Sequence, residues 1–170
     1  MKNYKDIMNV AVVNFKVDAG QKENNLRRID EFSVAAAKRG ADLVVFPELS
    51  LTGYDYFIDD DISSEEKKAM AETIDGPACI HIAKTARKYG IYIVFGMAEV
   101  FGDSADKVYN SAVAIGPDGV IGSYKKIHPF DAENKFFTKG DAPFMFDTEW
   151  GPVSIGICYG TFQFPELMRH

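Results

Sequence analysis

The sequence predicts an α/β domain built on a mixed β-sheet, and three patterns lead to this expectation. Residues 10–46 consist of an apolar run, an amphipathic segment and a second apolar run, the size of a β–α–β unit, whose strands normally pair in parallel. Residues 108–127 contain two apolar runs around Gly-Pro-Asp-Gly at 116–119, a turn signal that predicts an antiparallel hairpin. Residues 144–158 form a further predicted hairpin. Parallel and antiparallel pairs in one chain indicate a mixed sheet.

The first unit begins with a predicted strand at Val10–Phe15, which we expect to be buried and central because its residues are almost all apolar. Apolar residues then recur at helical spacing between Leu26 and Ala37, and Arg39-Gly40 ends the predicted helix with a cation and a glycine. Leu43–Phe46 is the second strand, and Pro47 stops it.

Two further helices are predicted before the hairpin. Ser63 and Glu66 have the spacing of a capping box, which predicts a helix that reaches about residue 74. Pro77 suits the first position of the next helix, whose buried face includes Cys79. Residues 91–101 read as extended chain around a glycine, and a last helix is expected to begin at about residue 164.

The composition is that of an ordinary globular protein. The chain has 170 residues, of which 46% are hydrophobic and 26% charged, enough for one domain, 1–170, with its own core. Its net charge of −6 argues against nucleic acid or an anionic membrane surface as the main partner. No apolar stretch is long enough to span a bilayer, and the polar segment 1–8 does not resemble a secretory signal, so we expect a cytoplasmic protein.

The number and spacing of cysteines and histidines indicate which redox compartment and which metal sites the chain is compatible with. The chain has only two cysteines, Cys79 and Cys158, which fits a reducing compartment. The three histidines are scattered, so no metal-ligand spacing is present. The acidic run 59–61 invites a calcium interpretation, but it lacks the alternation and the distal glutamate of a calcium loop, and a solvated surface fits it better.

Three candidate catalytic residues each follow a predicted strand. Cys158 ends the apolar run 153–157, a position where open α/β folds place reactive groups, although a buried structural cysteine is the alternative. Glu48 directly follows the second strand and is flanked by apolar residues that could make it a working base. Lys125 and Lys126 end the hairpin, and strand alternation allows only one of them to face a given site.

The residues around these three positions resemble a known family. Phe-Pro-Glu-Leu-Ser-Leu-Thr-Gly-Tyr at 46–54, Tyr-Lys-Lys-Ile-His at 124–128, and Gly-Ile-Cys-Tyr at 156–159 followed by Phe-Pro-Glu-Leu are similar to the three signature blocks of the nitrilase superfamily, the carbon–nitrogen hydrolases. The order and wide spacing of the blocks also match, and the resemblance covers the chain from Asn9 onward.

This resemblance implies an αββα sandwich, four-layered when paired, and a Glu–Lys–Cys triad. By position, Cys158 is the nucleophile, Glu48 the general base and Lys126 the cation beside the developing oxyanion, which would also favour the Cys158 thiolate. Glu133 matches a second glutamate that the family places near the site. The family requires no cofactor or metal.

The expected reaction is hydrolysis of a small linear amide or N-carbamoyl compound through a thioester, with amidase favoured over nitrile hydrolysis. Closeness to the triad in sequence suggests Tyr54, Phe130 and Tyr159 as residues that line the substrate pocket. Relatives of this kind are usually dimers, so a homo-oligomer is expected.

The sequence departs from the family pattern in two places. Gly160 stands where many members have an acidic residue, two positions past the nucleophile, and the chain stops at His170, where family members continue through further strands and helices. We therefore expect a domain that is incomplete at its C-terminus.

One alternative is a catalytically incompetent fragment that serves as an interaction or oligomerisation module. Another is a thiol hydrolase that pairs Cys158 with His128, which would leave the Glu48 and Lys126 blocks unexplained.

Overall fold

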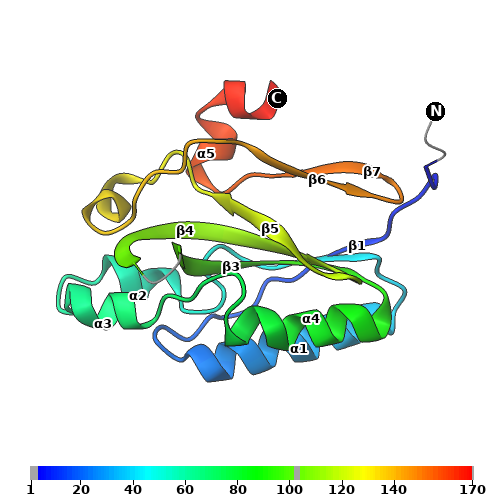
Figure 1. Cartoon of the computed structure of the whole chain (residues 1–170), viewed down its shortest axis with the longest axis horizontal. Coiled ribbons are helices and arrows are strands. Elements are labelled where there is room, and N and C mark those ends of the chain that lie inside the picture. The colour runs from blue at the N-terminus through cyan, green and yellow to red at the C-terminus, as the bar shows by residue number, and fades with distance from the viewer. Residues whose placement is uncertain (1–3, 102–103, 170) are drawn as a thin grey trace.

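The computed structural model describes residues 4–101 and 104–169 and places them in three layers (Figure 1). The central layer is a five-stranded sheet in the order β1-β2-β3-β4-β5. β1 (Val10–Val12), β2 (Leu43–Val45) and β3 (Tyr92–Phe101) are parallel, whereas β4 (Ser104–Gly116) and β5 (Gly119–Lys125) continue the sheet as antiparallel neighbours. The prediction of a mixed sheet with a hairpin at 108–127 is therefore confirmed.

The two outer layers cover opposite faces of this sheet. α1 (Lys22–Ala37) and α4 (Pro77–Tyr89) lie along one face, and the predicted last hairpin, β6 (Phe144–Thr148) with β7 (Gly151–Ile155), lies along the other (Figure 1). α2 (Tyr54–Ile58) and α3 (Ser64–Ala69) stand beside the sheet at one end. The chain closes with the short α5 (Tyr159–Phe162) and the 3-10 helix η2 (Pro165–Arg169).

Alternating side chains of β3 build a separate core on each face of the sheet, as the two-residue period of a strand requires. Ile93, Phe95 and Met97 pack toward the helices, and Val94 packs toward β6–β7. Cys79 lies in the helix-side core with its sulfur 3.8 Å from that of Met97. Burial, together with nearby acidic side chains, raises the pKa of the Cys79 thiol to about 12, so this cysteine is the structural one.

The prediction of a buried, central first strand is wrong. β1 is shorter than the predicted segment and forms an edge of the sheet, so Val10 and Val12 are 50% and 79% exposed. An apolar run indicates a strand, but its place in the sheet depends on which other strands pair with it.

Two helix boundaries also differ from those predicted. The capping box at Ser63 is present, but α3 ends at Ala69 and does not reach residue 74, because Glu72 pairs with Glu99 of β3 instead. The predicted C-terminal helix is present as the 3-10 helix η2, which begins at Pro165 rather than at residue 164, and the short α5 precedes it.

The topology brings the predicted site residues to one edge. β5 is antiparallel to β4, which is antiparallel to β3, so β5 runs in the same direction as β2 and β3. The carboxyl ends of β2 and β5, where Glu48 and Lys126 follow, therefore lie on the same side of the sheet.

Candidate active site

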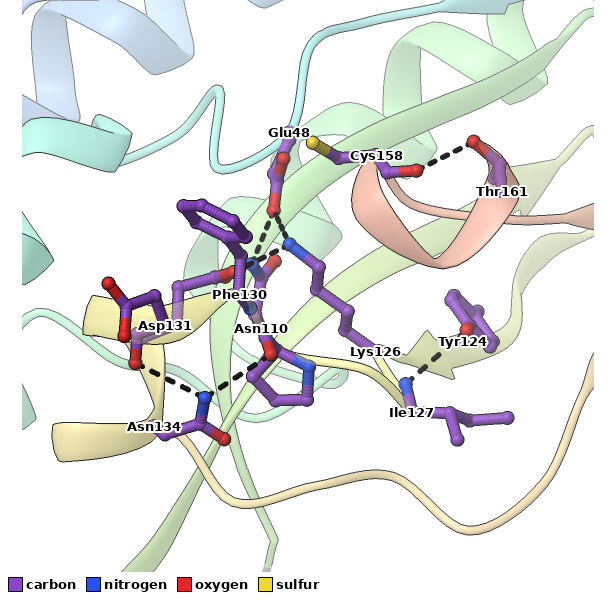
Figure 2. A network of polar contacts seen from close by, with 12 residues as sticks. Glu48, Asn110, Tyr124, Lys126, Ile127, Phe130, Asp131, Asn134, Cys158 and Thr161 are labelled. Atoms are coloured by element: carbon purple, nitrogen blue, oxygen red, sulfur yellow. Dashed lines mark hydrogen bonds and ion pairs between the residues drawn. The ribbon is translucent and has the colours of Figure 1, made fainter. Parts of the chain in front are cut away.

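Four predicted residues meet at this edge: Figure 2 shows Glu48, Lys126 and Cys158, and Glu133 contacts Lys126. Glu48 follows β2, Lys126 follows β5, and Glu133 lies in the 3-10 helix η1 (Asp131–Lys135). Cys158 stands between β7 and α5, and its sulfur lies beside the Glu48 carboxyl group (Figure 2).

The centre of the cluster is a buried lysine held by two carboxylates. Nζ of Lys126 lies 2.6 Å from Oε1 of Glu48 and 2.7 Å from Oε2 of Glu133. The side chains of Lys126 and Glu133 are fully buried, and that of Glu48 is 17% exposed. Burial alone would lower the pKa of Lys126, but the hydrogen bonds and charges of Glu133 and Glu48 outweigh it, so the pKa is raised and the group is an ammonium ion.

Asn110 on β4 belongs to the same cluster, and the sequence analysis missed it. Its Nδ2 donates to Oε1 of Glu48 at 2.7 Å and to Oε1 of Glu133 at 2.6 Å, and its carbonyl oxygen accepts from the backbone N–H of Lys126 at 2.8 Å. One feature of the sequence could have indicated Asn110: it is an amide within the apolar run 108–115. A buried amide in a strand needs hydrogen-bond partners, which suggests a polar cluster nearby.

Close backbone packing fixes the position of Glu48. Leu51 N–H donates to the carbonyl oxygen of Gly96 on β3, and Ser50 Oγ accepts from Gly96 N–H. A Cβ atom on residue 96 would lie 2.8 Å from the Pro47 carbonyl oxygen and closer still to the Leu49 nitrogen. Glycine at position 96 therefore allows the loop that carries Glu48 to lie directly on the sheet.

Backbone strain is concentrated around the cluster. In the described part of the chain, three non-glycine residues have positive φ: Leu49 at 48°, Asp131 at 26° and Cys158 at 43°. Leu49 adjoins Glu48, Asp131 begins the turn that carries Glu133, and Cys158 is the candidate nucleophile. Such conformations persist where the surrounding packing enforces them, and they are concentrated at functional sites.

Opposing effects act on the Cys158 thiol: Lys126 favours the thiolate, as expected, but the net shift of the pKa favours the neutral thiol. Partial burial and the negative charge of Glu48 raise the pKa of Cys158 above its ordinary value. Lys126 and the backbone N–H of Tyr159 act in the opposite direction but are outweighed. A thiol in this state needs a base to remove its proton, and the carboxylate beside it is Glu48.

The two lysines point to different places, as strand alternation predicts. Lys125 lies 3.5 Å from Glu99 and over the rings of Phe101 and Tyr109, away from the cluster. The structure thus brings Lys126, and not Lys125, to Glu48.

The three predicted lining residues border the cluster. Burial raises the pKa of Tyr54 to about 12, with smaller contributions from the charges of Glu133, Glu48 and Cys158. The rings of Phe130 and Tyr159 meet edge to face at 5.2 Å, and Phe130 N–H donates to Glu133. Their contact with a substrate stays a prediction.

His128 does not serve Cys158 in this arrangement. Its ring stacks on Phe164 with the centroids 3.6 Å apart and the planes within 2°. Its buried Nδ1 has no hydrogen-bond partner among the described residues. The Cys–His alternative therefore has no contact to support it.

A cleft of about 210 Å³ opens between the two sheets beside the cluster. Glu48 and Cys158 line one end, and side chains of both sheets line the rest, among them Leu43, Val94, Ala112, Val153 and Ile155. Tyr54, Phe130 and Tyr159 do not line this cleft, so they border the triad from another side.

Residues 4–101 and 104–169 contain neither a metal-binding cluster nor a membrane-spanning helix. No group of three or more His, Cys, Asp or Glu side chains in these ranges is arranged to hold a metal ion, and Asp60 of the acidic run pairs with Lys135. No helix in the same ranges has the length and apolar character needed to cross a membrane.

Comparison with known proteins identifies relatives of the whole chain. The family model described as carbon-nitrogen hydrolase matches residues 9–170. A protein named nitrilase from Pyrococcus abyssi is 39% identical over 165 residues, which are 96% of this chain and 60% of that protein. The omega-amidase NIT2 of Homo sapiens is 33% identical over 160 residues, covering 87% of this chain and 53% of the relative. The chain thus spans about 60% or less of the length of these relatives.

Solved structures share the fold. An amidase from Nesterenkonia sp. AN1 superimposes with a TM-score of 0.77 at 25% identity, covering 96% of this chain and 61% of the amidase. A variant of that amidase, 24% identical to this chain with a TM-score of 0.76, was solved in complex with butyramide.

We predict that Gly96→Ala displaces the Glu48 loop. The added methyl group meets backbone atoms that cannot move independently, so we expect a loss of about 1–3 kcal/mol in the free energy of unfolding, measured with urea. Gly90→Ala is the control, because Gly90 has a left-handed φ of 66° and open space around it, so this variant strains the backbone without displacing the Glu48 loop. Equal Cys158 alkylation kinetics in the two variants would contradict the proposed role of Gly96.

We also predict that Cys158 alkylation by iodoacetamide has its pH midpoint above the ordinary cysteine value. A neighbouring carboxylate disfavours the thiolate, so Glu48→Gln should lower the midpoint, read by peptide mass spectrometry. Glu99→Gln makes the same change at a buried carboxylate beside Lys125 and should leave the midpoint in place. A midpoint that Glu48→Gln leaves unchanged would show that Glu48 does not act on the thiol.

Proposed function

The chain belongs to the carbon–nitrogen hydrolase family, and on this premise we propose that it carries the catalytic triad of an enzyme that hydrolyses a small linear amide or N-carbamoyl compound. The observation that carries the proposal is a neutral, solvent-exposed Cys158 thiol beside Glu48, whose carboxylate is held by the buried Lys126. The relatives named nitrilase and omega-amidase, and the butyramide complex of the Nesterenkonia amidase, support this class of substrate.

In the first half of the proposed reaction, Glu48 takes the thiol proton as the Cys158 sulfur attacks the carbonyl carbon. The carbon–sulfur bond forms and the carbonyl π electrons move to the oxygen. The Lys126 ammonium and the Tyr159 backbone N–H stabilise the oxyanion, and losing one such donor costs roughly 3–4 kcal/mol in comparable sites. The electrons then return, the carbon–nitrogen bond breaks, and the proton held by Glu48 passes to the departing amine.

In the second half, the thioester is hydrolysed with the same groups. Glu48 takes a proton from water as the water oxygen attacks the thioester carbon, and the same donors stabilise the second oxyanion. The carbon–sulfur bond breaks, the acid departs, and Cys158 recovers its proton. Glu133 keeps Lys126 charged and in place throughout, which its buried 2.7 Å contact supports.

The architecture of the whole protein is also a proposal. The helix, sheet and sheet layers described above would be three layers of an αββα sandwich, with further helices on the outer face of β6–β7. Met145 on that face is 55% exposed, which fits a surface that another layer covers. A homo-oligomer, dimer or larger, stays a prediction.

A catalytically incompetent interaction module is the second candidate, and Gly160, which stands two positions past Cys158 where many family members have an acidic residue, favours it. Comparing the reactivities of the two thiols would not separate the candidates, because Cys79 is buried and reacts slowly in either case. Accumulation of an acyl-enzyme on Cys158 from an amide or an activated ester would separate them.

We expect Cys158→Ala and Glu48→Gln each to abolish turnover of any amide that the protein hydrolyses. The first variant lacks the nucleophile and the second lacks the base, and ammonia release with small aliphatic amides or carbamoyl compounds is the measurement. Amidase activity retained in Cys158→Ala would disprove the thioester mechanism.

The two lysines provide a matched pair of variants. Lys126→Ala should reduce kcat/KM by at least a hundredfold, because the proposed oxyanion donor is removed and Glu133 is left buried without its partner. Lys125→Ala removes an identical side chain one residue away and should keep most of the activity. Equal losses in variants that remain folded would mean that Lys126 has no special role.

A further inference from the structure

Asn110 makes more contacts with the cluster than its neighbours on β4 do. Its side-chain amide bridges the carboxylates of Glu48 and Glu133, and its backbone carbonyl holds the backbone of Lys126. Asn110 is 1% exposed, and both side-chain bonds are 2.6–2.7 Å long, the short end of the range for charge-assisted hydrogen bonds.

The orientation of this amide is set by charge. Oδ1 of Asn110 is buried and has no hydrogen-bond partner among the described residues. The reverse orientation would turn that oxygen toward two carboxylates and leave both without the donor. An unsatisfied buried acceptor costs free energy, so the bonds to the glutamates compensate for it.

We propose that Asn110 is a positioning residue of the active site, whose NH₂ group holds Glu48 and Glu133 as a pair of carboxylates around Lys126 and thereby aims Glu48 at Cys158. The role in turnover rests on the function proposed above, but the role in the cluster does not.

The charge balance of the cluster explains why such a donor is needed. One ammonium faces two carboxylates, so the cluster carries a net negative charge within a largely buried space. Two neighbouring carboxylates repel each other, and one of them tends to take up a proton. A shared NH₂ group places one donor hydrogen on each carboxylate, which offsets their mutual repulsion and favours a Glu48 that can accept the thiol proton.

Each element around the cluster contributes a group that faces the glutamates. Lys126 comes from the end of β5, Asn110 from β4 and Tyr54 from α2, while Cys158 follows β7 and the backbone N–H of Phe130 precedes η1. Within this set, Asn110 is the group that donates to both carboxylates with an uncharged side chain. Its removal therefore changes no formal charge.

The first test follows the carboxylates directly, without any substrate. Protein labelled with ¹³C at the glutamate side-chain carboxyl is titrated by NMR, and Glu48→Gln and Glu133→Gln variants assign the two signals. In Asn110→Leu, which keeps a similar volume but has no donor, we expect protonation of the pair to begin at higher pH than in the native protein, because carboxylates that lose a donor bind protons more readily.

Ser111→Ala is the matched control. Ser111 is the next residue on β4, is equally buried, and its Oγ has no partner among the residues described, so its removal breaks no hydrogen bond and should leave both titrations in place. If Asn110→Leu does not fold, Asn110→Ser replaces it, since its shorter side chain cannot bridge both carboxylates. Unchanged carboxylate titration in a folded Asn110 variant would overturn the proposal.

The second test measures turnover. We expect the folded Asn110 variant to lose at least tenfold in kcat with little change in KM, and its pH–rate profile to have an acid limb at higher pH than the native protein. A purely structural role would lower stability without moving that limb. If the native protein turns over no amide or carbamoyl compound, the function proposed above fails, and the NMR titration still decides the role of Asn110.

Discussion

The ammonium group of Lys126 lies where water does not reach, and the rest of the site depends on how its charge is compensated. Moving an ion from water into a protein interior costs several kcal/mol, which is recovered only by close, well-oriented partners. Those partners are Glu48 and Glu133, 78 and 7 residues away in sequence. The lysine can therefore be charged and buried only when β2, β5 and η1 have come together, so folding and assembly of the site are the same event.

Tight backbone packing provides the precision that this ion cluster needs. Gly96 lets the Glu48 loop rest on β3, and Gly140 plays a similar part for the lysine, because a Cβ there would collide with the backbone of Lys125. The N–H of Gly140 also donates to the Lys126 carbonyl oxygen at 2.9 Å. These two glycines thus position Glu48 and Lys126, and the strained backbone of Leu49 belongs to the loop that packs on Gly96.

The neutral state of the Cys158 thiol fits this electrostatic arrangement. A lysine near a cysteine normally favours the thiolate, yet here its charge is shared with two carboxylates, and Glu48 also faces the sulfur. The structure therefore places a carboxylate beside a thiol whose neutral form is favoured, rather than a preformed thiolate–ammonium pair. This arrangement suits a proton transfer that occurs as the substrate is attacked.

The sequence by itself determined the strand–helix–strand unit, the hairpin at 108–127 and the capping box at Ser63, because these depend on local periodicity and turn chemistry. Its short motifs also predicted Glu48, Lys126, Glu133 and Cys158 as site residues, and the structure brings these four together. The sequence did not determine that β1 lies at an edge, that α3 ends at Ala69, or that Asn110 joins the cluster. Each of these depends on pairing between segments distant in the chain. The charge state of Cys158 also depends on tertiary structure. Glu48 lies 110 positions earlier in the chain, and only folding brings its carboxylate next to the thiol.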